Sequence, residues 1–187
     1  LRWRYFYRRR RKQTTVRYGC VTARSPRTGR RSRFSYQGDI YTVPSSGGKA
    51  RQLTTHPAHD TRPVWSPDGQ RIAFASNRSG NFDVFLMNKE GGEPKRLTTH
   101  STNEYPTTFK DNGHILYLAN VLQDAKDIQF PGTRFMQVYE ISTDGGRPDL
   151  YSSLYMENIA LSKDGSKLLY NDYKGYEDPW RKHHQSS

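Results

Sequence analysis

The sequence has a single cysteine and no long apolar run. Cysteine occurs once, as Cys20, so no disulfide can form within the chain and no cysteine-based metal site is available. The longest apolar run, ILYLANVL at 115–122, is far shorter than the roughly 20 residues that a membrane-spanning helix needs. These absences argue against a disulfide scaffold, a cysteine–zinc module and a helical membrane span within these 187 residues.

The sequence also lacks the motifs of common active sites. It contains no G-x-S-x-G nucleophile elbow, no P-loop and no H-E-x-x-H zinc motif. The stretch GGKA at 47–50 ends in alanine where a P-loop needs serine or threonine, so we interpret it as a turn between strands. Ser186 and Ser187 have no base or orienting carboxylate beside them in a motif, and a nucleophile needs both. We therefore predict no catalytic residue, no cofactor and no metal ion for this chain.

Acidic residues are absent from the beginning of the chain. Residues 1–33 contain thirteen lysines and arginines, whereas residues 34–187 contain seventeen basic and eighteen acidic residues, so the whole net charge of +12 comes from the first 33. The near-neutral remainder argues against nucleic acid as the main partner. Three interpretations of the basic segment stay open. It is an arm that binds phosphate groups, a solvated disordered tail, or out-of-frame sequence in which arginines replace the strand and SPDG turn expected before Phe34.

What the chain does have is an internal repeat. The pentapeptide QLTTH at 52–56 returns almost unchanged as RLTTH at 96–100, 44 residues later, together with its flanking residues. A third, looser copy follows after an insertion at 121–135. We place the three units at about 34–76, 77–120 and 133–172. A fixed period of about 40–45 residues is typical of propeller blades.

Each unit has the composition of a small antiparallel sheet. Short runs of β-branched and aromatic residues, such as RIAFAS and DVFLM, predict strands rather than helices. The motifs SPDG (66–69), KDNG (110–113) and KDGS (163–166) supply Asp, Asn and Gly where a tight turn needs positive φ. The predicted fold class is all-β: a partial β-propeller of about three four-stranded blades over residues 34–187, because a closed ring normally has about four to eight blades.

The six histidines do not form a metal-binding pattern. His56 and His100 occupy the same repeat position, so we expect them to hydrogen bond within blade loops. His59 and His114 are expected to be solvated turn residues. The pair at 183–184 would face opposite sides of a strand, which argues against a shared metal ion.

The aspartates and glycines that recur with the repeat are predicted to be structural. Asp39 and Asp83 open equivalent strands, where we expect their carboxylates to accept backbone N–H bonds. Trp65 is expected in the core, as are Phe109 and Leu161 at its place in the later units. The full set of predicted structural repeat positions is Asp39, Gly48, Trp65, Asp68, Gly69, Asp83, Gly92, Gly113, Gly146, Asp164 and Gly165.

The units resemble the TolB-like propeller repeat. An aspartate-led strand, a Gly-Gly pair and L-T-x-H, followed by W-S-P-D-G and I-A-F, carry this resemblance across residues 38–120. The second unit departs from the pattern, with FKDNG in place of WSPDG, and the third unit is weaker. The resemblance implies the propeller fold, which many functions use.

A narrower resemblance points to tricorn-type serine peptidases. The stretches NRSGNFDVFLMNKEGGEPKRLT (77–98) and NDYKGYEDPWRKHHQSS (171–187), with the insertion at 121–135, resemble the N-terminal propeller of these enzymes. This implies that the chain gates or guides peptides to a catalytic domain outside these residues. The implied partners are peptides, further blades and that catalytic domain, and the resemblance is compatible with a homo-oligomer of the full-length protein.

The alternative function is a non-enzymatic TolB-like propeller for protein–protein interaction. The tricorn resemblance implies a cytoplasmic location, whereas the TolB alternative implies a periplasmic or exported one.

Overall fold

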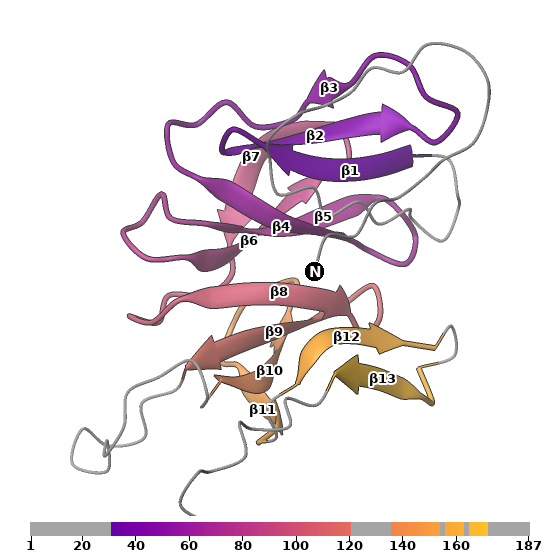
Figure 1. Cartoon of the computed structure of the whole chain (residues 1–187). Coiled ribbons are helices and arrows are strands. Elements are labelled where there is room, and N and C mark those ends of the chain that lie inside the picture. The colour runs from indigo at the N-terminus through magenta and orange to yellow at the C-terminus, as the bar shows by residue number, and fades with distance from the viewer. Residues whose placement is uncertain (1–30, 121–135, 154–155, 163–164, 172–187) are drawn as a thin grey trace, which may run out of the picture.

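The described part of the chain consists of strands and turns. A computed structural model describes residues 31–120, 136–153, 156–162 and 165–171. Within these ranges thirteen strands form four antiparallel sheets, and no helix is long and apolar enough to cross a membrane. The four sheets follow one another in chain order, as the colours in Figure 1 show. The predicted all-β, propeller-like architecture is confirmed.

Two of the described sheets have four strands. One contains β4 (Asp60–Trp65), β5 (Arg71–Ser76), β6 (Asp83–Asn88) and β7 (Gly91–Arg96), ordered as in the chain. The next contains β8 (Glu104–Phe109), β9 (His114–Asn120), β10 (Met136–Ser142) and β11 (Asp149–Ser152). Each is an up-and-down meander, the strand order of a propeller blade.

The first and last described sheets are smaller. The first contains β1 (Arg31–Tyr36), β2 (Asp39–Pro44) and β3 (Arg51–Gln52). The last contains β12 (Glu157–Leu161) and β13 (Leu168–Asn171). Strand β1 begins at Arg31, within the basic segment 1–33, and the insertion at 121–135 lies outside the described residues.

The sheets divide the chain at different places from the sequence units. Each four-stranded sheet begins with the strand that ends in Trp65 or in Phe109, and it ends after the next Gly-Gly turn. A unit placed at about 34–76 therefore contains strands of two neighbouring sheets. A repeat can be cut at any phase without changing its period, so the letters alone do not show where one sheet ends and the next begins.

Burial on both faces explains the sequence of the middle strands. In β5, Ile72 and Phe74 point into an apolar cluster with Ile40 of the first sheet, whereas Ala73 points into another cluster with Ile115 of the third. All five side chains are fully buried: Ile40, Ile72, Ala73, Phe74 and Ile115. Successive residues of a strand face opposite sides. A strand between two neighbouring sheets therefore reads as the continuous apolar run RIAFAS.

The turn before β9 differs from its predicted form. Gly69 has a φ of 70° in the SPDG turn, but Gly113 is not among the glycines with positive φ. Ser66 N–H donates to the carbonyl of Arg71 across the first turn, whereas Lys110 N–H donates to that of His114. The second turn is therefore one residue shorter and closes without a left-handed glycine, so the predicted positive φ at Gly113 is wrong.

The Gly-Gly pair at the beginning of β7 provides a matched pair of test positions. Gly91 and Gly92 have φ values of 88° and 107°, which both strain an alanine. A Cβ atom on Gly91 would lie 3.0 Å from the main-chain oxygen of Leu53 in the first sheet, whereas one on Gly92 would meet nothing within 4 Å. We expect Gly91→Ala to lower the free energy of unfolding by about 2 kcal/mol more than Gly92→Ala, since only the first change pushes two sheets apart. Chemical denaturation measures this difference. Equal losses would show that the contact with Leu53 contributes nothing.

Candidate functional site

The two L-T-T-H segments lie at one end of the sheets, which we call the TTH end. It consists of the loops 53–59, 77–82 and 97–103 and of the strand residues that adjoin them. Strands β4, β6 and β8 begin at this end, and β5 and β7 finish there. The N–H of Asp60 donates to the carbonyl of Gly38, and that of Glu104 donates to the carbonyl of Phe82, so each first strand is bonded to a loop of the preceding sheet.

The threonines of the TTH end hold the beginning of each repeat strand. Thr54 Oγ1 accepts the backbone N–H of Ile40 at 3.0 Å and lies 3.2 Å from the carboxylate of Asp39, to which it donates. Thr98 Oγ1 accepts the N–H of Val84 at 2.9 Å in the same way. At each strand the threonine hydroxyl thus accepts a backbone N–H hydrogen bond, the kind of bond that we expected the aspartate carboxylate to accept.

That expectation for Asp39 and Asp83 is therefore wrong, because in the described residues the carboxylates bond side chains. Asp39 also accepts a hydrogen bond from the Gln52 amide at 2.9 Å. Asp83 is fully buried and lies 2.8 Å from the guanidinium of Arg96. A carboxylate needs charged or strongly polar partners when it is buried, and a side chain supplies them better than a single N–H does.

Asp60 and Arg78 form a second buried ion pair. One guanidinium nitrogen of Arg78 lies 3.1 Å from each carboxylate oxygen of Asp60, whose side chain is fully buried. The guanidinium carbon also lies 4.8 Å from the ring centre of Phe85 and 5.6 Å from that of Phe74. The arginine is thereby enclosed between a carboxylate and two aromatic faces, so neither charge is left alone.

Glu104 occupies the position of Asp60 in the next sheet, but its surroundings differ. Burial raises its pKa to about 7, and the negative charge of Asp83 adds to the effect, while the Thr98 hydroxyl opposes it. Burial also raises the pKa of Asp83 above its usual value, although Arg96 acts in the opposite direction. Each carboxyl group has one buried oxygen without a hydrogen-bond partner in the described residues, Oδ2 of Asp83 and Oε2 of Glu104. Both interact with one arginine, Arg96, so with burial the neutral form of Glu104 persists to higher pH.

The histidines serve the loops. His56 Nδ1 accepts the N–H of Ala58 at 3.0 Å, and His100 Nδ1 accepts that of Thr102 at 3.3 Å. The predicted structural role of both histidines is thus confirmed. His59 is exposed, and its ring packs edge-on against Phe82 at a centroid distance of 6.2 Å.

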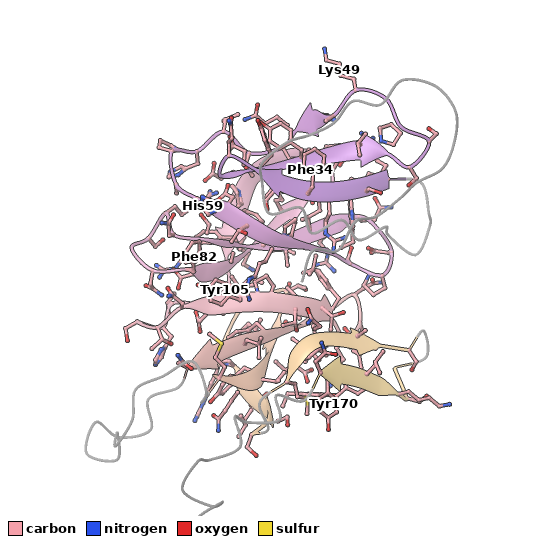
Figure 2. The ribbon with its side chains drawn as sticks, viewed as in Figure 1. Phe34, Lys49, His59, Phe82, Tyr105 and Tyr170 are labelled. Atoms are coloured by element: carbon pink, nitrogen blue, oxygen red, sulfur yellow. The ribbon has the colours of Figure 1, made fainter. Side chains whose placement is uncertain are left out.

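An aromatic row crosses the TTH end between neighbouring sheets. Phe82 continues from His59 to Tyr105, with 5.5 Å between the Phe82 and Tyr105 ring centres. The guanidinium of Arg62 lies 4.1 Å above the Tyr105 ring. Figure 2 shows His59, Phe82 and Tyr105 one after another along the same side of the sheets. The row is partly exposed and ends in a cation, so it offers aromatic faces and a positive charge to a ligand.

The first strands of the last three described sheets are bulged at one shared place. The pairing register shifts between Thr61 and Val64 in β4, between Pro106 and Thr108 in β8, and between Glu157 and Ala160 in β12.

Within two of these bulges one residue has positive φ, with 49° at Arg62 and 51° at Asn158. A bulge redirects side chains and releases backbone groups from the ladder. In β4 the released carbonyl of Pro63 accepts the buried guanidinium of Arg33 from the first sheet.

The described residues do not bring together a nucleophile, a base and an orienting acid. His100 Nδ1 lies 3.1 Å from the Thr102 hydroxyl, but that hydroxyl donates to the carbonyl of Asn120 at 2.7 Å and so keeps its proton. His114 pairs with Asp111 at 3.0 Å in an exposed turn, away from any described hydroxyl partner. No group of three or more His, Cys, Asp or Glu side chains in the described ranges could hold a metal ion.

The predicted repeat positions described next lie either in the core or at glycines with positive φ. Trp65 and Phe109 are buried in the core, and Leu161 is partly buried. Positive φ is found at the predicted turn positions Gly48, Gly69, Gly92, Gly146 and Gly165. The positions 20, 164, 183–184 and 186–187 lie outside the described residues.

The structure brings Asp39 and Asp83 to the TTH end, whereas Asp68 and Gly113 lie in facing turns at the opposite end, where the N–H of Asp68 donates to Asn112 Oδ1. Sequence reasoning missed Asp60, Arg78 and Glu104 altogether. The spacing of 44 residues between Asp60 and Glu104 was a usable signal, because two carboxyl groups recur at one repeat position.

A family model matches most of the chain. The model described as the tricorn protease N-terminal beta propeller domain matches residues 25–187, a range that contains all thirteen described strands.

Three solved structures are similar to parts of the chain. The putative TolB from Agrobacterium tumefaciens is 22% identical, with a TM-score of 0.56 over 70% of this chain and 48% of its own. TolB from Acinetobacter baumannii is 19% identical, with a TM-score of 0.61 over 83% of this chain and 38% of its own. The tricorn protease is 17% identical, with a TM-score of 0.47 over 64% of this chain and 13% of its own. The chain thus spans less than half the length of each structure, and the two TolB structures, at these identities, bear on the fold alone.

Proposed function

The chain belongs to the family of tricorn protease N-terminal β-propeller domains, and from that membership we propose that it guides peptides to a serine peptidase domain lying outside these residues. The match over residues 25–187 is the observation that carries the proposal. The chemistry agrees with a guiding role, since a channel or sieve needs shape and polar lining rather than a nucleophile.

The first strands of the sheets supply such a lining. In a propeller the first strand of each blade adjoins the central channel. Figure 1 shows β4, β8 and β12 beside one another. Arg62 and Asn158 are exposed on these strands, and Thr61, Tyr105 and Thr107 are partly exposed. Hydroxyl, amide and guanidinium groups can bond the backbone of a passing peptide without regard to its sequence.

A test of this role uses the peptidase that carries the domain. We expect Arg62→Ala to lower kcat/KM for long peptides by about two- to fivefold, the equivalent of about 0.5–1 kcal/mol for one exposed cation contact. Hydrolysis of a short chromogenic substrate should not change, because such a substrate does not reach the strands of the propeller. Lys49→Ala is the matched control, since Lys49 lies on the outer turn of the first sheet (Figure 2). Equal effects on long and short substrates would contradict the guiding role.

The gene itself separates the proposal from the alternative. A reading frame that continues past the codon of Ser187 into further blades and a serine-bearing domain is the expected result. A stop codon directly after Ser187 would overturn the peptidase role. Protein–protein interaction by a TolB-like propeller, the function motivated by the fold shared with the two TolB structures, would then take its place.

A further inference from the structure

The short turn between β8 and β9 contains an asparagine followed by a glycine. Asn112 is exposed. Gly113 has no side chain that would shield its own backbone nitrogen from the side-chain amide of Asn112. In such a pair the nitrogen of the glycine can attack the side-chain carbonyl carbon of the asparagine and close a five-membered ring. Two things normally limit this reaction: the backbone N–H is a very weak acid, and the amide carbon is a poor electrophile.

A carboxylate is placed against the nucleophilic nitrogen. The N–H of Gly113 donates to Asp111 Oδ1 at 2.6 Å, and both oxygens of that carboxylate lie 3.0 Å from His114 Nδ1. Although partial burial raises it, the hydrogen bonds from His114 and Gly113 hold the pKa of Asp111 below its usual value. The group is therefore ionised at neutral pH, in contact with the proton that must leave.

A hydrogen-bond donor is placed against the electrophile. The backbone N–H of Asp68, in the facing turn of the second sheet, donates to Asn112 Oδ1 at 3.1 Å. The guanidinium of Arg71 bonds the main-chain carbonyl of the same asparagine. The N–H of Asp68 thus bonds Asn112 Oδ1, the oxygen that becomes negative when Asn112 Cγ is attacked. Together the bonds from Asp68 and Arg71 hold Asn112 in position.

We propose that Asn112 is a site of self-catalysed modification, in which the Gly113 nitrogen attacks the Asn112 Cγ atom and converts Asn112 to a succinimide. A bond forms between these two atoms while Asp111 accepts the proton of the nitrogen. The bond from Cγ to Nδ2 then breaks, the proton passes to Nδ2, and ammonia leaves. Water subsequently opens the ring at either carbonyl, which gives aspartate or isoaspartate at position 112. No oxidant or reductant is needed.

The modification acts on a link between two sheets. The bonds from Asp68 and Arg71 to Asn112 join the turn of the second sheet to that of the third. The product places a new negative charge beside Asp68 and Asp111, and isoaspartate also adds a methylene group to the backbone. We therefore expect the product to weaken this link irreversibly as the protein ages.

The experiment incubates the purified full chain at neutral pH and physiological temperature and follows the peptide that contains Asn112 by mass spectrometry. The expected result is a gain of about 1 Da at that residue, at a rate about tenfold or more above that of Asn120 in the same strand–turn unit. A synthetic, unfolded peptide of residues 108–118 gives the rate that the Asn-Gly sequence has without the fold. The folded chain should react faster than this peptide. A slower reaction in the folded chain would overturn the proposal, since it would show that the turn protects Asn112.

Two variants separate the roles of the neighbours. Gly113→Ala should nearly abolish the reaction, because the added Cβ hinders ring closure; it would lie 3.3 Å from Asp111 Oδ1. Asp111→Ala should slow the reaction in the folded chain toward the peptide rate while leaving the peptide itself almost unaffected. An unchanged or higher rate in folded Asp111→Ala would overturn the role of the carboxylate as the base.

Discussion

Replacing Asp60 by alanine is expected to lower the free energy of unfolding by about 3–5 kcal/mol, one of the largest effects of any single change in this chain. The reason is the arginine that remains. The Arg78 side chain is only 12% exposed and lies 3.1 Å from both oxygens of Asp60, between the rings of Phe74 and Phe85. Without the carboxylate its charge is neither paired nor hydrated. Chemical denaturation followed by tryptophan fluorescence and circular dichroism measures the loss.

A double-mutant cycle distinguishes this explanation from simple loss of packing. The variant that combines Asp60→Ala with Arg78→Met removes both charges and keeps most of the volume of the arginine. It should be more stable than Asp60→Ala alone by about 1–3 kcal/mol. Asp144→Ala, at an exposed turn, is the control and should change the free energy of unfolding by about 0.5 kcal/mol or less. If the double variant is as unstable as the single one, the charge of Arg78 is not the cause of the loss.

The fold could be predicted from sequence because its signals are local. A strand such as RIAFAS and a turn such as SPDG each lie within a few residues, and the 44-residue period repeats them. The resemblance to TolB-like repeats and to the tricorn N-terminal propeller is likewise confirmed by the family match. The short turn at 110–113 could also have been detected. Trp65 and Ile72 are seven residues apart, but their equivalents Phe109 and Ile115 are six apart, so one turn residue is missing.

The ion pairs could not be predicted in the same way because their partners are distant. Asp60 and Arg78 are separated by two strand segments and a turn, and nothing in the letters around Arg78 marks it as buried. Asp60 and Glu104 hold the same repeat position, yet one carboxyl has an arginine of its own and the other shares the arginine of Asp83. Repeat symmetry thus predicts where a carboxyl group lies but not its charge, which depends on neighbours from other strands.

The stability of the chain is expected to depend on pH through Glu104. Burial raises the pKa of this group from 4.5 to about 7 in the folded chain, so its neutral form is favoured by folding. The stabilisation is fully present below pH 4.5, falls as the pH rises and is lost above about 7. Because 1.36 kcal/mol corresponds to one pKa unit, the group should account for a loss of about 3 kcal/mol across this interval. The raised pKa of Asp83, also caused mainly by burial, acts in the same direction.

Glu104→Gln isolates this effect, because the amide has the shape of the neutral carboxyl group and does not titrate. The free energy of unfolding of the variant minus that of the original chain should increase by about 3 kcal/mol between pH 4.5 and about pH 8. Urea denaturation at a series of pH values measures the difference. Glu93→Gln on the exposed strand β7 is the control, and its difference from the original chain should stay nearly constant. A constant difference for Glu104→Gln as well would mean that Glu104 is ionised in the folded chain.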